Sequence, residues 1–113
     1  MATLYIAEYR QLASVPSATN FAPQAGQGGQ EPDATEQVVA ISGSSTASVP
    51  FGGYTALVRI HTDVICSIVF STVAQITTNT VPTALTTNKR LAANQTEYFG
   101  VLPNQRVAVI VNV

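Results

Sequence analysis

The sequence predicts an all-β protein, an antiparallel β-sandwich with jelly-roll-like connections and seven or eight short strands in one domain, residues 1–113. Three observations predict this class. Apolar and polar residues alternate with a period of two in several short runs, and turn-forming residues separate these runs at regular intervals. No segment repeats its apolar residues every 3.6 positions over about ten residues, so we expect almost no helix. The connections are too short for crossover helices, which favours antiparallel pairing.

The first half of the chain holds two clear strand signals. Thr3–Tyr9 alternates with Leu4 and Ile6 on one face, and alternation resumes at Glu36–Ile41. Gly52-Gly53 then stands between two extended runs, which favours a two-residue hairpin turn.

The second half predicts five more strands. The segment Thr72–Lys89 is rich in threonine and reads as a loop or a weak edge strand, because Pro82 cannot donate to a ladder. Turns are expected around Asn94 and Asn104, since asparagine tolerates a positive φ. The expected strands are Tyr54–Thr62, Val64–Ser71, Arg90–Ala92, Thr96–Leu102 and Arg106–Val113.

The alternation also predicts which side chains form the core. They are Leu4, Ile6, Val39, Ile41, Leu57, Val58, Ile60, Ile65, Val69, Phe99, Val101, Val107, Val109 and Val111.

The last strand is apolar on both faces. Val107, Val109, Val111 and Val113 share one face, and Ala108 and Ile110 share the other. Such a strand is usually covered on both sides. We expect the core on one side, with a second protein as a candidate cover for the other.

The segment Ala13–Asp33 loses all periodicity and contains three prolines and the polar tract Gln24–Gln30. A structureless stretch of this length in a small domain is usually disordered or functional. We therefore predict a polar extended loop or arm at about residues 13–34, ordered by a neighbouring molecule. The candidate partner contacts are Phe21, its large apolar residue, with Gln24, Gln27 and Gln30.

The composition excludes several classes of function. Charged residues form 10% of the chain, against roughly 25% in an average domain, and the net charge is −1. The few basic residues are scattered, which argues against nucleic acid. No apolar run approaches the ~20 residues that span a bilayer, so we expect no membrane association.

The start MATLYIAEYR lacks a signal-peptide pattern, and Cys66 has no partner for a disulfide, so we expect synthesis in a cytoplasm.

No catalytic or metal site is predicted. His61, Asp63 and Ser67 could share a strand face, but no nucleophile elbow or glycine-rich anion loop accompanies them. One histidine and one cysteine fall short of a zinc set. Three carboxylates, Glu31, Asp33 and Glu36, lack the spacing of a known calcium loop and read as solvated charges. We expect a protein that is not an enzyme and carries no cofactor.

The order of features from Tyr54 to Val113 resembles the small decoration (cement) proteins of tailed bacteriophage capsids. The run TALVRIHTDVICSIVFS leads through a threonine-rich loop to KRLAANQTEYFGVLPNQRVAVIVNV, and the start MATLYIAEY also looks similar. In these runs, the turn of small residues at Ala92-Ala93-Asn94 and the aromatic-Gly-Val strand Tyr98–Val101 carry the likeness.

The resemblance implies a structural virion protein on the outer surface of a phage head, made in the host cytoplasm. Its expected partner is the major capsid protein, whose subunit contacts it would stabilise as a homo-oligomer or in multiple copies on the shell. Two alternatives stay open: a phage tail or head-fibre module, and a carbohydrate- or protein-binding β-sandwich domain.

Overall fold

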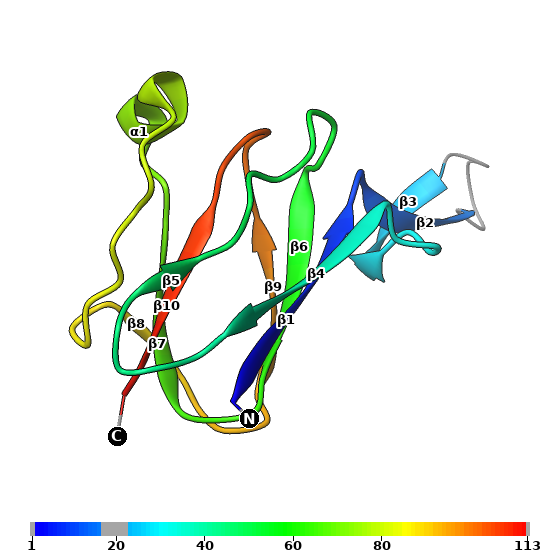
Figure 1. The fold of residues 1–113 in the computed structure, drawn as a ribbon. Helices are drawn as coiled ribbons and strands as arrows, with labels where there is room; N and C mark the ends of the chain where they lie inside the picture. Colours follow the sequence, from blue (N-terminus) through cyan, green and yellow to red (C-terminus); the bar gives the residue numbers. More distant parts are fainter. Residues whose placement is uncertain (1, 17–22, 113) are drawn as a thin grey trace.

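The computed structural model describes residues 2–16 and 23–112, with only the backbone at residues 13–16 and 23–28. Two four-stranded sheets form a sandwich, which confirms the predicted all-β class (Figure 1). We call the sheet with strand order β4-β1-β6-β9 the β1 sheet and the sheet with order β5-β10-β7-β8 the β10 sheet. The β1 sheet contains β1 (Thr3–Tyr9), β4 (Thr35–Ala40), β6 (Leu57–Thr62) and β9 (Thr96–Gly100). The β10 sheet contains β5 (Thr46–Ala47), β7 (Cys66–Phe70), β8 (Lys89–Leu91) and β10 (Val107–Val111).

The strand pairs are nested as in a jelly roll. The pair β7·β8 is innermost in the sequence, and the pairs β6·β9 and β5·β10 enclose it in turn. These pairs are antiparallel, and successive pairs belong to alternate sheets. The strands β1 and β4 both precede this nested set, and β1 lies between β4 and β6 in the β1 sheet.

The turns use asparagine where the backbone needs a positive φ. Asn94 and Asn104 have φ of 60° and 66° and lie in the two turns that the sequence predicts. The Gly52-Gly53 turn also forms, and the Thr55 N–H donates to the Gly52 carbonyl at 3.1 Å. It does not make a hairpin, because β5 before it and β6 after it belong to different sheets.

The core lies between the two sheets and contains most of the predicted residues. Phe99, Val101 and Val111 are partly buried against it, and Phe51 and Leu91 were missed by the alternation because they lie in a loop and a very short strand. The predicted residues in its fully buried cluster are Leu4, Ile6, Val39, Ile41, Val58, Ile60, Val107 and Val109.

The prediction of which β7 side chains face the core is wrong. Cys66 and Ile68 face the core, whereas Ile65 and Val69 are only half-buried. The run from Val64 to Phe70 is apolar at almost every position, so alternation cannot decide which residues point inward. Leu57 is buried as predicted, but in a separate cluster with Ala7 and Tyr9.

The expected loop or edge strand at residues 72–89 contains a short helix, α1 (Val73–Thr78). A capping box starts it: the Gln75 N–H donates to the Thr72 hydroxyl at 3.2 Å, and the Thr72 N–H donates to the Gln75 side chain at 2.9 Å. Asn79 ends it in the left-handed region, with φ of 55°. The spacing Thr-x-x-Gln is the sequence signal for this helix.

The second cover of the last strand comes from the chain itself. Residues 81–88 cross the outer face of the β10 sheet, where Ala84 and Ala108 are almost completely buried. The Asn112 amide donates to the Thr86 carbonyl at 3.0 Å, and the Ala84 N–H donates to the Ser45 hydroxyl at 2.8 Å. A second protein is therefore not needed to explain why β10 is apolar on both faces.

The segment predicted to be structureless includes a two-stranded hairpin, which we call the arm: β2 (Leu12–Pro16) and β3 (Pro23–Gly29). Leu12 pairs with Gly29 at its base, and the register shifts between Leu12 and Ser14. The arm extends beyond the β1 sheet, on the side away from the β10 sheet (Figure 1). The sequence of the arm is polar and rich in proline and lacks apolar alternation, so the pattern did not predict these strands.

Candidate binding face

The two outer faces of the sandwich differ. Residues 81–88 cover the β10 sheet, whereas much of the β1 sheet is open on its outer side. Large side chains on that side are substantially exposed: Val38 at 66%, Tyr5 at 44% and Tyr98 at 42%. We call this surface the open face; it consists of Tyr5, Ala7, Glu36, Val38, Arg59, His61, Thr96 and Tyr98.

Strand register places these residues in two adjacent rows. The first row runs Val38, Tyr5, His61 and Thr96 across β4, β1, β6 and β9. The second row runs Glu36, Ala7, Arg59 and Tyr98 across the same strands. Because alternate residues of a strand point to opposite faces, both rows face away from the core.

The base of the arm covers one end of this outer side. Tyr9 and Leu57 are buried there, and Gly29 lies directly against the Tyr9 ring. The Tyr9 hydroxyl donates to Glu31 Oε2 at 2.9 Å. Burial, together with this hydrogen bond, raises the pKa of Tyr9 to about 12. The neutral tyrosine therefore helps to hold the arm on the sheet.

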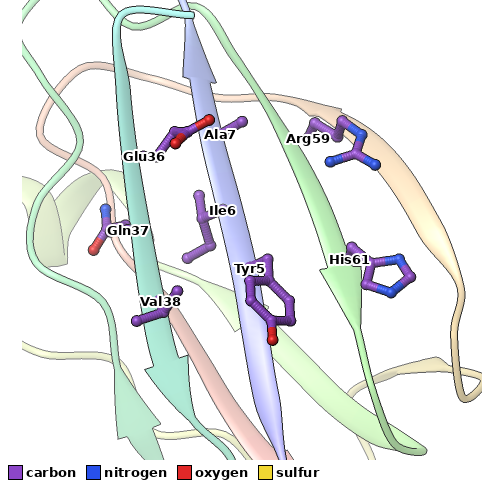
Figure 2. A pocket seen from close by; sticks show the side chains of 8 residues that line it. All are labelled: Tyr5, Ile6, Ala7, Glu36, Gln37, Val38, Arg59 and His61. Carbon is purple, nitrogen blue, oxygen red and sulfur yellow. The ribbon is translucent and has the colours of Figure 1, made fainter.

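A hollow of about 320 Å³ lies on the remaining, uncovered part of the open face. Ala7 occupies the middle of the second row, and its short side chain leaves a gap between the longer side chains of Glu36 and Arg59. Figure 2 shows Glu36, Ala7 and Arg59 in one row, with Tyr5 and His61 in the next. The hollow thus has an apolar floor and walls that carry charge and aromatic rings.

Hydrogen bonds and nearby charges act on the polar side chains around the hollow. The His61 Nδ1 and the Thr96 hydroxyl form a 2.7 Å hydrogen bond, and the Tyr5 and His61 rings lie 6.1 Å apart between centroids. A hydrogen bond with the Asp33 carboxyl, and the charge of Asp33, raise the pKa of Glu36. This contact ties Glu36 to the acidic segment at the base of the arm.

Of the four predicted contact residues, the structure describes the side chain of Gln30 alone. Phe21 lies outside the described residues, and Gln24 and Gln27 are described only as backbone in β3. Gln30 is exposed just after the arm, and its amide donates to the Glu31 carbonyl at 3.3 Å. The contact role of these four residues stays a prediction.

The residues considered for catalysis and metal binding lie apart. His61 is on the open face, whereas Ser67 is buried under residues 81–88, where its hydroxyl donates to the Thr86 carbonyl at 3.3 Å. Cys66 is in the core, and burial raises the pKa of its thiol. Among the described residues, no group of three or more His, Cys, Asp or Glu side chains is placed to hold a metal ion.

Glu8 is a buried ionisable residue with a structural role that the sequence analysis did not identify. It is buried on the inner side of β1, and its carboxylate accepts from Gly52 N–H at 2.9 Å, Thr55 Oγ1 at 2.9 Å and Gln37 Nε2 at 3.1 Å. These bonds join the first strand to β4 and to the turn that precedes β6. Its period-two position beside Leu4 and Ile6 was the available signal.

Comparison of the chain with protein-family models, curated proteins and solved structures gives no match, so no family is shown. In the part of the chain that the structure describes, α1 is the longest helix, and no helix has the length and apolar character to span a bilayer.

Proposed function

We propose that this protein is a structural virion protein that binds the outer surface of a tailed-bacteriophage head. It would stabilise contacts between subunits of the major capsid protein, in multiple copies on the shell and without enzymatic activity. The strand pattern from Tyr54 to Val113 that resembles decoration proteins supports this proposal, as does the charge-poor composition. The jelly-roll sandwich is consistent with it.

The observation that carries the attachment proposal is the arm. Backbone hydrogen bonds hold its base, from Gln30 N–H to the Gln11 carbonyl at 3.0 Å and from Ala34 N–H to the Glu8 carbonyl at 2.8 Å. An extended polar hairpin beyond the sandwich is suited to lie across a neighbouring subunit.

The mechanism is thermodynamic. A ligand that binds the assembled shell and not its dissociated subunits stabilises the shell by mass action. Many symmetric copies add their contributions, so a modest affinity at each site is sufficient. In this proposal the arm makes the attachment, so the open face of the β1 sheet need not be covered by the shell.

Shortening the arm tests the proposal. Because Leu12 and Gly29 are paired, residues 13–28 can be replaced by an Asn-Gly turn that keeps Gly29, Gln30 and Glu31 in place. We expect the shortened protein to unfold at nearly the same temperature as the full chain and to lose most of its co-sedimentation with expanded heads. Val73→Ser, on the exposed surface of α1 and far from the arm in Figure 1, is the control and should attach normally.

Each outcome of this experiment is informative. Failure of the full-length protein to co-sediment would count against the capsid function itself. Equal attachment of the full and shortened chains would place the contact elsewhere on the molecule. Unfolding of the shortened chain would mean that the arm is part of the structural core.

A further inference from the structure

The hollow on the open face has opposite charges on two sides of a small floor. Register places Glu36 on β4 and Arg59 on β6, each paired with Ala7 on β1 between them. Ala7 is 8% exposed, so its methyl group forms the bottom of the hollow. A ligand resting on Ala7 therefore has a carboxylate on one side and a guanidinium on the other.

These two groups suit a ligand with many hydroxyls. A carboxylate only accepts hydrogen bonds, and a guanidinium only donates them in a planar fork. A hydroxyl does both, so adjacent hydroxyls of one molecule can donate to Glu36 and accept from Arg59. Glu36 also shares a hydrogen bond with the Asp33 carboxyl, so the acidic side of the hollow is a pair of carboxyl groups that faces Arg59. An anion would be repelled by the acidic side and a cation by Arg59, whereas a neutral ligand is repelled by neither.

The aromatic side chain that borders the hollow suits the same ligand. Tyr5 lines the hollow from the neighbouring row, whereas Tyr98 lies beyond Arg59 in the second row and does not line it. Both tyrosine residues are more than two-fifths exposed, although exposed aromatic surface is unfavourable in water. The C–H face of a sugar ring is apolar while its rim carries hydroxyls, which matches apolar rings beside charged walls. The volume is at the lower end of the ~300–1,000 Å³ range of ligand pockets.

We propose that the hollow above Ala7 is a binding site for a neutral saccharide, held between Glu36 and Arg59 and packed against Tyr5. This inference does not depend on the capsid function, because it concerns a different surface from the arm. A saccharide site on a shell-bound protein would give the particle a means of adhering to glycans. The same site would serve a free carbohydrate-binding domain equally.

Titration of the isolated ¹⁵N-labelled protein tests the site. The probes are maltotriose, lactose and N,N′-diacetylchitobiose as neutral saccharides, and 3′-sialyllactose as an acidic one. We expect at least one neutral probe to shift the backbone amides of Tyr5, Ala7 and Arg59. Arg59→Gln should weaken that binding about tenfold, as loss of a charged hydrogen-bond donor does. Arg90→Gln, on an exposed position of β8, is the matched control and should bind as the unmodified protein does.

Three results would overturn the proposal. One is the absence of shifts at these amides with every neutral probe at about 20 mM, well above a ~1 mM dissociation constant. Another is binding of 3′-sialyllactose alone, which would assign the site to an anion. The third is unchanged affinity of the Arg59→Gln protein in a spectrum that otherwise overlays on the native one. Since the experiment uses no phage heads, its failure would leave the capsid proposal standing.

Discussion

Replacing Glu8 by alanine is expected to lower the free energy of unfolding by about 3 kcal/mol, a large fraction of the stability of a small domain. The Glu8 carboxylate is 1% exposed and accepts hydrogen bonds from Gly52, Thr55 and Gln37. The alanine variant would leave these donors facing a cavity instead of an acceptor. Equilibrium unfolding in urea measures the change.

Two further variants show whether the hydrogen bonds cause the effect. Glu8→Gln keeps the shape and one acceptor oxygen, so its loss of stability should be smaller than that of Glu8→Ala. Glu97→Ala removes an exposed carboxylate that accepts from the Gln95 amide at 2.7 Å, and it should change stability by less than about 0.5 kcal/mol. If Glu8→Ala is no more destabilising than Glu97→Ala, the network around Glu8 contributes little.

Replacing Gly29 by alanine is expected to detach the base of the arm from the β1 sheet. A Cβ atom at Gly29 would overlap the ring of Tyr9, which is itself buried. Either the Tyr9 ring or the backbone of β3 must move, and overpacking of this kind costs roughly 1–3 kcal/mol. Loss of the Tyr9–Glu31 hydrogen bond should accompany the movement, so the pKa of Tyr9 should fall from about 12 toward its usual value. Urea unfolding and an ultraviolet titration of tyrosine measure the two effects.

Gly43 provides the matched control, because a Cβ there meets nothing within 4 Å. Gly43→Ala should be neutral or slightly stabilising, since alanine restricts the unfolded chain. If the Gly29 and Gly43 variants have equal stability and an equal Tyr9 titration, the contact between the arm and Tyr9 does not hold the two together.

The sequence predicted the fold class because alternation is a local property. Leu4 and Ile6, or Val107 and Val109, report the inner face of their strands without knowledge of their neighbours. Alternation failed in β7, where both faces are apolar. Contacts with the rest of the sandwich decide that Cys66 and Ile68 face the core. The cover of the β10 sheet by residues 81–88 also depends on contacts between distant segments.

The open face could not be predicted from the sequence, because it depends on which residues of neighbouring strands are paired. Tyr5 and His61 are 56 positions apart by number, and only the pairing of β1 with β6 places them together. The hollow depends further on Ala7 being the residue between Glu36 and Arg59. Sequence reasoning selected instead the polar tract Gln24–Gln30, which composition alone makes visible. The arm is present as a hairpin, but its contacts are still predictions.

The most direct test of the proposed function compares phage heads that lack the protein with the same heads after it is added back. Thermal disruption and osmotic shock measure the stability of both preparations. We predict that heads without the protein break at a lower temperature and a smaller osmotic step, and that saturating the heads with the protein restores both values. Equal stability of the two preparations, with the protein shown to be bound, would contradict reinforcement of the shell.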